Sequence, residues 1–335
     1  MRFPRLPAIA LAVALLALAL GLAACGEKSE DTTGAETEPL SLTLDFYPNP
    51  DHAGIYMAQK LGYFADAGLD VSIQTPSDPA APIKLVAAGQ TDLAISYEPE
   101  VLLAKEQGLD VVAVGAVVDR PLTSLIWLRK SGVKGVADLR GKTIATAGIP
   151  YQDAYLKTIL ARAKLTPSDV NTVNVGYGLL PALVGGRAQA MLGGFSNVEG
   201  VDLRLRGKNP VVTPVDKLGV PSYDELVLVA KRERLEEDPE TIRLFLAALA
   251  RGTAAAIQSP GAAADALLEA NSDLDPKLTR AEVAATLPLL SKSGFMDPPK
   301  WNRFIAWMQR NDLISTLPPA SAVLDNAYLA GQIPE

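Results

Sequence analysis

Short apolar runs rich in β-branched residues alternate with helix-like segments from residue 40 onward. The first set comprises, in chain order, 42–46, 54–67, 71–75, 81–88, 93–96, 100–107 and 111–118. Strands separated by helical crossovers pair in parallel, so this order predicts an α/β lobe with helices on both faces of a sheet. A second set repeats the pattern and predicts a second lobe. Its segments are 143–147, 154–163, 172–176, 180–186, 188–192, 199–206 and 211–215.

Two further apolar runs, 124–129 and 225–230, lie at the ends of the second set and are predicted to carry the chain between the lobes. Lobe one would then comprise 40–129 and 219–335, and lobe two 130–218. Two crossings between lobes are typical of a hinge. Helical segments follow the second crossing and are predicted to pack on lobe one. They are 239–259, 261–270, 280–290, 299–311 and 320–330.

The first 24 residues have the composition of an export signal. Arg2 and Arg5 precede an apolar run over 8–21, and Leu-Ala-Ala stands directly before Cys25. A basic start followed by an apolar stretch is typical of a signal peptide. The Leu-Ala-Ala-Cys sequence resembles the lipobox of bacterial lipoproteins, whose cysteine is acylated after cleavage. We therefore expect a signal peptide over 1–24 and lipidation of Cys25.

The segment after the cysteine contains no large apolar side chain. Residues 26–39 include five acidic residues and one lysine, a composition that cannot bury enough surface to order itself. We predict that 25–39 is a lipidated, disordered tether. The protein is expected to be exported and held by its lipid on the outer face of the cell membrane or in the periplasm.

Length and charge restrict the class of protein further. The chain has 335 residues, 48% of them hydrophobic, which suits two folded domains. Its net charge of −7 and its lack of any run of Lys and Arg argue against a nucleic-acid surface. The chain contains one cysteine, Cys25, and one histidine, His52, which are too few ligands for a Cys/His zinc site. We predict no metal and no cofactor.

Motifs of common enzymes are incomplete. Gly176 begins a G-x-G pattern, but Pro181 occupies the position of the third glycine. The sequence Gly-Lys-Thr over 141–143 ends like a phosphate-binding loop, whereas Val136 stands where the first glycine belongs. Ser196 lies outside any G-x-S-x-G motif. We therefore predict no catalytic residues.

Polar and aromatic side chains gather where the predicted strands end. In open α/β sheets these ends meet at one edge, where ligands bind. Aromatic rings combined with carboxylates and amides suit a flat ligand with polar edges. The candidate ligand-binding residues are Asp45, Phe46, Asn49, His52, Tyr97, Glu98, Tyr151, Asn197, Glu199 and Tyr223.

Several of these residues have a structural interpretation as well. Asn49 suits a helix N-cap, and Glu199 suits the first turn of a helix, where the helix dipole favours an acid. A lone buried histidine such as His52 is more often structural than ligand-binding. Tyr97 and Tyr223 also suit an interface or a core.

Several stretches resemble the solute-binding proteins of ABC importers for thiamine-pyrimidine precursors, a branch related to fungal pyrimidine synthases. They are 44–64, 91–104, 138–145, 193–200 and 219–230. The sequences NPDHAG and NVEG within them are the most specific. The resemblance implies a two-lobed periplasmic-binding-protein fold of type II, in the α/β class, with a mixed sheet flanked by helices in each lobe. A two-linker hinge would close the lobes over a small heterocyclic solute.

The resemblance also implies how the solute is held. Aromatic side chains would stack on an aminopyrimidine ring, and Glu199 would pair with the ring nitrogen and amino group, because a carboxylate offers two acceptors to two parallel donors. Phe46 and Val198 stand where the family usually has Trp. Riboflavin or another flat heterocycle is therefore the alternative cargo within the same importer role.

The related fungal synthase consumes its own histidine and holds pyridoxal phosphate on a lysine. The resemblance places Ser96 and Glu100 at those two positions, so we expect no such chemistry here. The expected partners are an ABC permease with its ATPase, the membrane through the lipid anchor, and no nucleic acid; we expect a monomer. The alternative from another class is a secreted enzyme that uses paired carboxylates, with Glu98 and Glu199 as candidates.

Overall fold

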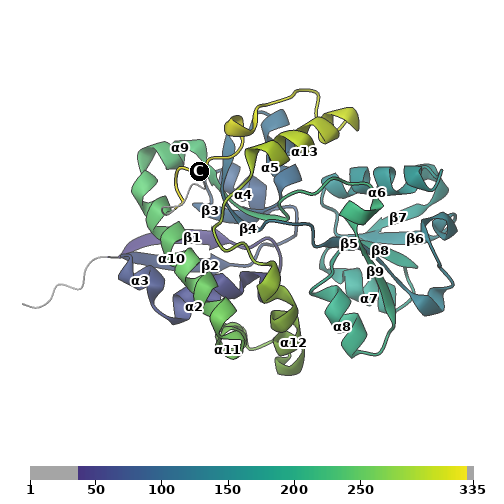
Figure 1. Ribbon diagram of the computed structural model, residues 1–335, viewed down its shortest axis with the longest axis horizontal. Helices are drawn as coiled ribbons and strands as arrows, with labels where there is room; N and C mark the ends of the chain where they lie inside the picture. The colour runs from purple at the N-terminus through teal and green to yellow at the C-terminus, as the bar shows by residue number, and fades with distance from the viewer. Residues whose placement is uncertain (1–36, 330–335) are drawn as a thin grey trace, which may run out of the picture. The chain divides into compact units, whose positions relative to one another are not determined.

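The computed structural model describes residues 37–329 (Figure 1). The predicted signal peptide, Cys25 and most of the predicted tether lie outside these residues. Thr37–Glu335 forms a compact unit of its own, and its buried hydrophobic residues form one continuous core. We therefore expect 37–335 to fold without the preceding segment. No helix within the described range is long and apolar enough to cross a membrane.

The first lobe is built on a five-stranded mixed sheet with the order β2-β1-β3-β10-β4. Its strands are β1 (Glu38–Thr43), β2 (Leu69–Gln74), β3 (Leu93–Ser96), β4 (Val111–Val118) and β10 (Leu226–Lys231). β1 pairs in parallel with β2 and β3, whereas β10 is antiparallel to both of its neighbours. The apolar run of β10 fits its position between two strands, where both faces are covered.

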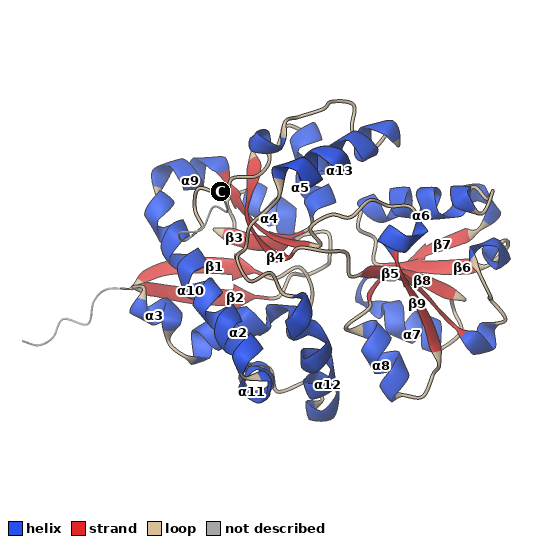
Figure 2. Cartoon of the chain, in the orientation of Figure 1, coloured by secondary structure: helices blue, strands red, loops and turns tan. Residues whose placement is uncertain are grey.

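The second lobe has a five-stranded sheet with the order β7-β6-β8-β5-β9. Its strands are β5 (Thr123–Leu128), β6 (Thr143–Thr146), β7 (Asn171–Asn174), β8 (Ala190–Phe195) and β9 (Pro210–Pro214). β6 is parallel to β7 and β8, and β5 is antiparallel to β8 and β9. Helices flank both sheets (Figure 2).

The first crossing between lobes lies earlier than the sequence pattern predicts. The expected crossing run 124–129 is mostly β5, a fully buried strand inside the second sheet, so the chain changes lobes over 119–122. The second crossing leads into β10 and returns the chain to the first sheet. An apolar run alone does not distinguish a linker from a central strand. β1 also begins at Glu38, within the predicted tether.

The helices largely follow the expected order. Lobe one carries α2 (Ala53–Lys60), α3 (Tyr63–Asp66), α4 (Pro82–Ala87), α5 (Glu98–Glu106), α9 (Arg232–Glu237), α10 (Pro239–Gln258), α11 (Pro260–Ala270), α12 (Pro276–Thr286) and α13 (Pro298–Arg310). Lobe two carries α6 (Tyr151–Arg162), α7 (Leu179–Val184) and α8 (Glu199–Leu205). A Cβ atom on Gly252 of α10 would lie 2.3 Å from the carbonyl oxygen of Gly54 in α2. Glycine at 252 thus permits this close helix packing.

The predicted helix over 320–330 is wrong. Over 320–329, which the structure describes, the only helical element is the short 3₁₀ turn Ala320–Ala322, and Leu324 makes a parallel bridge with Ala113 of β4. The amide of Ala113 donates to Val323, and the amide of Asp325 donates to Ala113. Pairing with the edge strand β4 satisfies these backbone groups and overrides the helical propensity of the segment.

Two of the C-terminal helices of lobe one also contact lobe two. α10 and α11 pack against α2 as expected, and α12 packs against α11 and also against α8 of lobe two. In α13, the ring of Trp307 lies 5.8 Å from that of Tyr155 in α6. Both contacts join the lobes, which makes these two helices part of the interlobe interface.

One carboxylate connects the two crossings. Glu225, just before β10, accepts hydrogen bonds from the backbone amides of Leu122 and Thr123 at 2.6 and 2.7 Å. It also accepts from the Thr123 hydroxyl at 2.7 Å and from the Tyr223 hydroxyl at 2.9 Å. Glu225 is fully buried, so these four donors compensate for the loss of hydration of its carboxylate.

Candidate functional site

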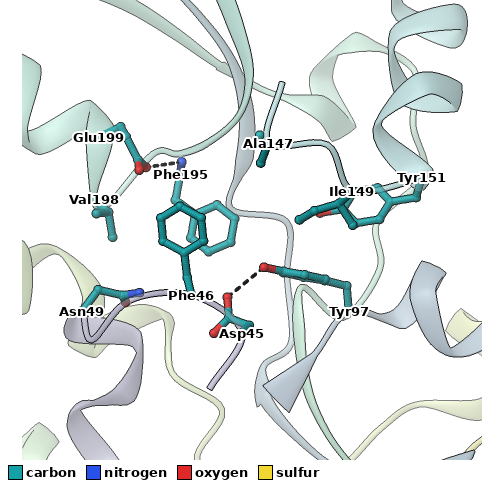
Figure 3. A pocket seen from close by; sticks show the side chains of 11 residues that line it. Asp45, Phe46, Asn49, Tyr97, Ala147, Ile149, Tyr151, Phe195, Val198 and Glu199 are labelled. Carbon is teal, nitrogen blue, oxygen red and sulfur yellow. Dashed lines mark hydrogen bonds between the residues drawn. The ribbon is translucent and has the colours of Figure 1, made fainter. Parts of the chain in front are cut away.

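A cavity lined by both lobes lies at the strand ends of the two sheets (Figure 3). Its lining residues are Asp45, Phe46, Asn49, Tyr97, Ala147, Ile149, Tyr151, Gly193, Phe195, Val198 and Glu199. The first four belong to lobe one and the others to lobe two. The edge of an α/β sheet, where strands lead into helix N-termini, is a usual place for a small-molecule site.

Six of the ten predicted residues meet in this cavity. They are Asp45, Phe46, Asn49, Tyr97, Tyr151 and Glu199. The other four, His52, Glu98, Asn197 and Tyr223, are buried outside the lining. The remaining lining residues are outside the predicted set, and all of them are apolar or glycine. They lie within β8 or shortly after β6 or β8, and this position is the one signal that could have indicated them.

Glu199 stands at the first position of α8, on the lobe-two wall. Its Oε2 accepts a hydrogen bond from the backbone amide of Phe195 at 2.7 Å, which fixes the carboxyl group (Figure 3). Burial raises the pKa of Glu199 to about 7; the amide of Phe195 partly offsets this, and Asp202 adds to it. A pKa near 7 leaves this carboxyl group partly protonated at neutral pH.

Asp45 faces Glu199 from lobe one and is held by two donors. Its Oδ2 accepts from the Tyr97 hydroxyl at 2.8 Å, and its Oδ1 lies 2.8 Å from Nε2 of His52. The backbone amide of Asn49 donates to Nδ1 of His52 at 3.2 Å, so the ring proton is on Nε2 and points to Asp45. His52 thus positions Asp45 from behind the cavity.

Aromatic rings form the remaining walls. In Figure 3 the Phe46 ring lies between the Asp45–Tyr97 pair and the Phe195–Glu199 pair. The Tyr97 and Tyr151 rings, one from each lobe, are 5.5 Å apart. Such walls favour a flat, unsaturated ligand.

A further aromatic contact joins the lobes beside Phe46. Tyr177 of lobe two meets Phe46 edge to face, with ring centroids 4.6 Å apart. The Tyr177 hydroxyl donates to the carbonyl of Pro76 in lobe one at 2.8 Å. The two lobes are therefore in contact on this side of the cavity.

Asn197 joins the lobes on another side. Its Nδ2 donates to Oδ1 of Asp51 and to Oγ1 of Thr286, both at 2.8 Å. Asp51 belongs to the 3₁₀ turn η1 (Pro50–His52), and Thr286 is the last residue of α12. The predicted role of Asn197 in direct ligand contact does not match this placement.

Glu98 and Tyr223 belong to the hinge region and not to the cavity. Oε2 of Glu98 accepts from the backbone amide of Asp224 at 2.6 Å, and burial raises the pKa of Glu98 well above its usual range. Tyr223 donates to Glu225, as described above. The Trp301 indole and Lys300 bind the Asp224 carboxylate. These contacts connect α13 to the second crossing.

Metal ligands are not gathered in this part of the protein. Within residues 37–329, no group of three or more His, Cys, Asp or Glu side chains is placed to hold a metal ion.

Comparison with known proteins finds relatives along most of the chain. The family model described as NMT1/THI5 like matches residues 49–263. A thiamine biosynthesis protein of Haemophilus influenzae is 36% identical over 83% of this chain and 88% of its own length. The formylaminopyrimidine-binding protein of Halalkalibacterium halodurans is 35% identical over 90% of this chain and 93% of its own.

Other relatives and solved structures extend this picture. Relatives that are 23 to 26% identical are named 4-amino-5-hydroxymethyl-2-methylpyrimidine phosphate synthases. The alkanesulfonate-binding protein SsuA of Xanthomonas axonopodis superposes with a TM-score of 0.68 over 87% of this chain and 99% of that chain, at 17% identity. This likeness concerns the fold alone. The predicted two-lobed, α/β periplasmic-binding-protein fold is confirmed.

Proposed function

Since this chain belongs to the NMT1/THI5-like family, we propose that it captures a pyrimidine precursor of thiamine in the interlobe cavity. The ligand would be of the formylaminopyrimidine or hydroxymethylpyrimidine type. The protein would act outside the cytoplasm as a lipoprotein anchored through Cys25 and deliver the solute to an ABC permease. The 35% identity to a formylaminopyrimidine-binding protein supports this ligand class.

The observation that carries the proposal is the fixed carboxyl group of Glu199 beside aromatic walls. An ionised carboxylate has about four acceptor positions, and the amide of Phe195 occupies one of them. An aminopyrimidine presents an amino N–H next to a ring nitrogen. One proton shared between Glu199 and that ring nitrogen gives two parallel hydrogen bonds, and the pKa of about 7 suits such sharing.

Binding without turnover is proposed over synthesis. The family resemblance assigns the consumed histidine and the cofactor-bearing lysine of the fungal synthase to the positions of Ser96 and Glu100. Ser96 ends β3 and Glu100 lies in α5; both are buried, and neither lines the cavity. Neither side chain can supply an imidazole or an amine.

Calorimetric titration of residues 37–335 tests the proposal. The protein is unfolded and refolded to remove carried ligand, then titrated with formylaminopyrimidine, hydroxymethylpyrimidine, thiamine and riboflavin. We expect one-to-one binding of a pyrimidine with a Kd below about 1 μM, or more than about 8 kcal/mol. A preference for riboflavin would support the proposed binding role and change the identity of the ligand. Failure of every ligand to bind refolded protein, or turnover of the bound pyrimidine, would overturn the proposal.

A further inference from the structure

We propose that Asp51 and Asn197, with Thr286, form an interlobe clasp in which Asp51 is a neutral carboxylic acid, so that closing the lobes takes up one proton. The inference rests on the proposed function, because the clasp acts on the lobes that close over the pyrimidine. Asp51 and Asn197 are positioning residues, since neither lines the cavity.

The clasp lies between the two chain segments that build the site. Asp51 precedes His52, and its backbone amide donates to the side chain of Asn49 at 2.9 Å. Asn197 lies two residues before Glu199 and bonds to Asp51 across the lobes at 2.8 Å. Asp51 is 1% exposed and Asn197 is 3% exposed. Forming the clasp therefore fixes a segment of each wall relative to the other.

Two buried oxygen atoms at the clasp lack hydrogen-bond donors. They are Oδ2 of Asp51 and Oδ1 of Asn197, and they belong to the same two side chains that the clasp already joins. In a pair between a carboxylic acid and an amide, the acid oxygen accepts from N–H while the acid O–H donates to the amide oxygen. We therefore assign a proton to Oδ2 of Asp51, with Oδ1 of Asn197, on the side chain already bonded to Asp51, as its acceptor; an ionised Asp51 has no donor to offer that oxygen.

The charges around Asp51 favour the neutral acid. Burial raises the pKa of Asp51 well above its usual range, and the carboxyl groups of Asp45, Glu199 and Glu225 raise it further, while Asn197 lowers it. A buried carboxylate facing other carboxylates is costly, so it takes a proton instead.

Other titrating groups lie close by and must be separated from Asp51. On α12, burial raises the pKa of Glu282 to about 9, and Glu199, Asp202 and Asp51 add to this, while Arg206 lowers it. On the 3₁₀ turn of Asp51 itself, the neighbouring histidine directs its proton to Asp45. The pH dependence of the wild-type protein is therefore a sum over several carboxyl groups.

The direction of the effect follows from linkage. Hydrated Asp51 in the open protein is ionised at neutral pH, since an ordinary aspartate has a pKa near 3.9. The closed protein holds it neutral, so its pKa is raised there, and closure is favoured at low pH. Between the two pKa values, this single proton reduces ligand affinity by up to about tenfold for each unit of rising pH.

The test compares wild type with Asp51→Asn, whose amide supplies the N–H in place of the acid O–H. Formylaminopyrimidine is titrated at pH 6, 7 and 8 in buffers of different ionisation enthalpy, which reports the protons taken up. We expect the variant to take up about one proton fewer at pH 7. We also expect the ratio of the variant's affinity to that of wild type to increase by up to about tenfold for each unit by which the pH is raised. Equal proton uptake, or no uptake by wild type, would overturn the clasp.

Glu282→Gln provides the matched control, because it removes a neighbouring titrating group and leaves the clasp intact. In that background Asp51→Asn should still remove about one proton from the uptake on binding. Loss of this difference would assign the proton to the wider acidic cluster and overturn the proposal.

A ligand-free measurement separates the clasp from the proposed function. Small-angle X-ray scattering of the ligand-free proteins from pH 5 to pH 8 should show the radius of gyration of wild type decreasing as pH falls, because protonation of Asp51 favours closure, whereas that of Asp51→Asn should depend less on pH. Parallel pH profiles would overturn the clasp. If refolded wild type does not bind the pyrimidine, the proposed function fails while this measurement still decides the clasp.

Discussion

Replacing Glu199 by Gln changes one atom of the cavity wall and reverses its hydrogen-bonding character. The amide of Phe195 donates to Oε2, so in the variant the carboxamide oxygen must occupy that position. The NH₂ group then takes the place of Oε1. A carboxamide can neither share a proton with the ring nitrogen nor carry a negative charge, so the charge-assisted bond to the ligand is lost.

The size of the effect follows from the bond that is lost. A hydrogen bond to a charged group contributes about 1.5 to 3 kcal/mol. At roughly 1.4 kcal/mol for each factor of ten, Glu199→Gln should weaken pyrimidine binding by about 10- to 150-fold. The folded structure should be little affected, because the bond to Phe195 is retained.

Calorimetric titration of both proteins with formylaminopyrimidine measures the change, and circular dichroism confirms the fold. Glu98→Gln is a matched control, since it makes the same substitution at a buried glutamate outside the cavity. We expect the control to bind within about threefold of wild type. If Glu199→Gln binds the pyrimidine as tightly as the control does, Glu199 does not recognise the ring, and the reasoning from its geometry fails.

Three further predictions follow from the buried polar groups. His52→Ala removes the hydrogen-bond partner of the Asp45 carboxylate and of the Asn49 amide, and should lower the free energy of unfolding by about 2 to 4 kcal/mol. Urea unfolding measures this change, and a loss of about 0.5 kcal/mol or less, as at an exposed site, would contradict the prediction. Glu225→Ala leaves the four buried donors without their acceptor and should cost about 3 kcal/mol or more in the same assay; unchanged stability would show that the four donors do not need the carboxylate. Because burial raises the pKa of Glu199 to about 7, its shared proton is held below pH 7 and lost above it. In an Asp51→Asn background, pyrimidine affinity should therefore fall by up to about tenfold per unit above pH 7, and a constant Kd up to pH 9 would refute the shared proton.

Local periodicity was sufficient to predict the two sets of strands and helices. It could not place the run 124–129, because an apolar segment is compatible with both a linker and a central strand. Only the pairing of β5 with β8 and β9 decides between them. The segment 320–329 illustrates the same limit, since a non-local pairing of Leu324 with β4 opposes the helix that its sequence favours.

For the site, the strand-end rule found the polar lining but not the orientation of every side chain. Asp45 and Glu199 were predicted and lie in the cavity. His52 and Asn197 also follow strand ends, yet their partners turn them away from it. Ile149 has an apolar side chain that would suit the core equally well, so its position in the cavity lining could not be predicted without the packing of the folded chain.

The four hydrogen bonds to the Glu225 carboxylate restrict how the two lobes can move relative to each other. Since one carboxylate binds both crossings, the crossings cannot slide along each other without breaking several buried hydrogen bonds at once. Bending of the flanking backbone would leave these bonds in place, so we expect any relative motion of the lobes to be a rotation about an axis close to this residue. Such a rotation would bring the two walls together in the same alignment at each closure. We therefore expect the cavity to distinguish solutes by their thickness and by the pattern of polar groups at their edges, because translation of one wall could not adapt it to another shape.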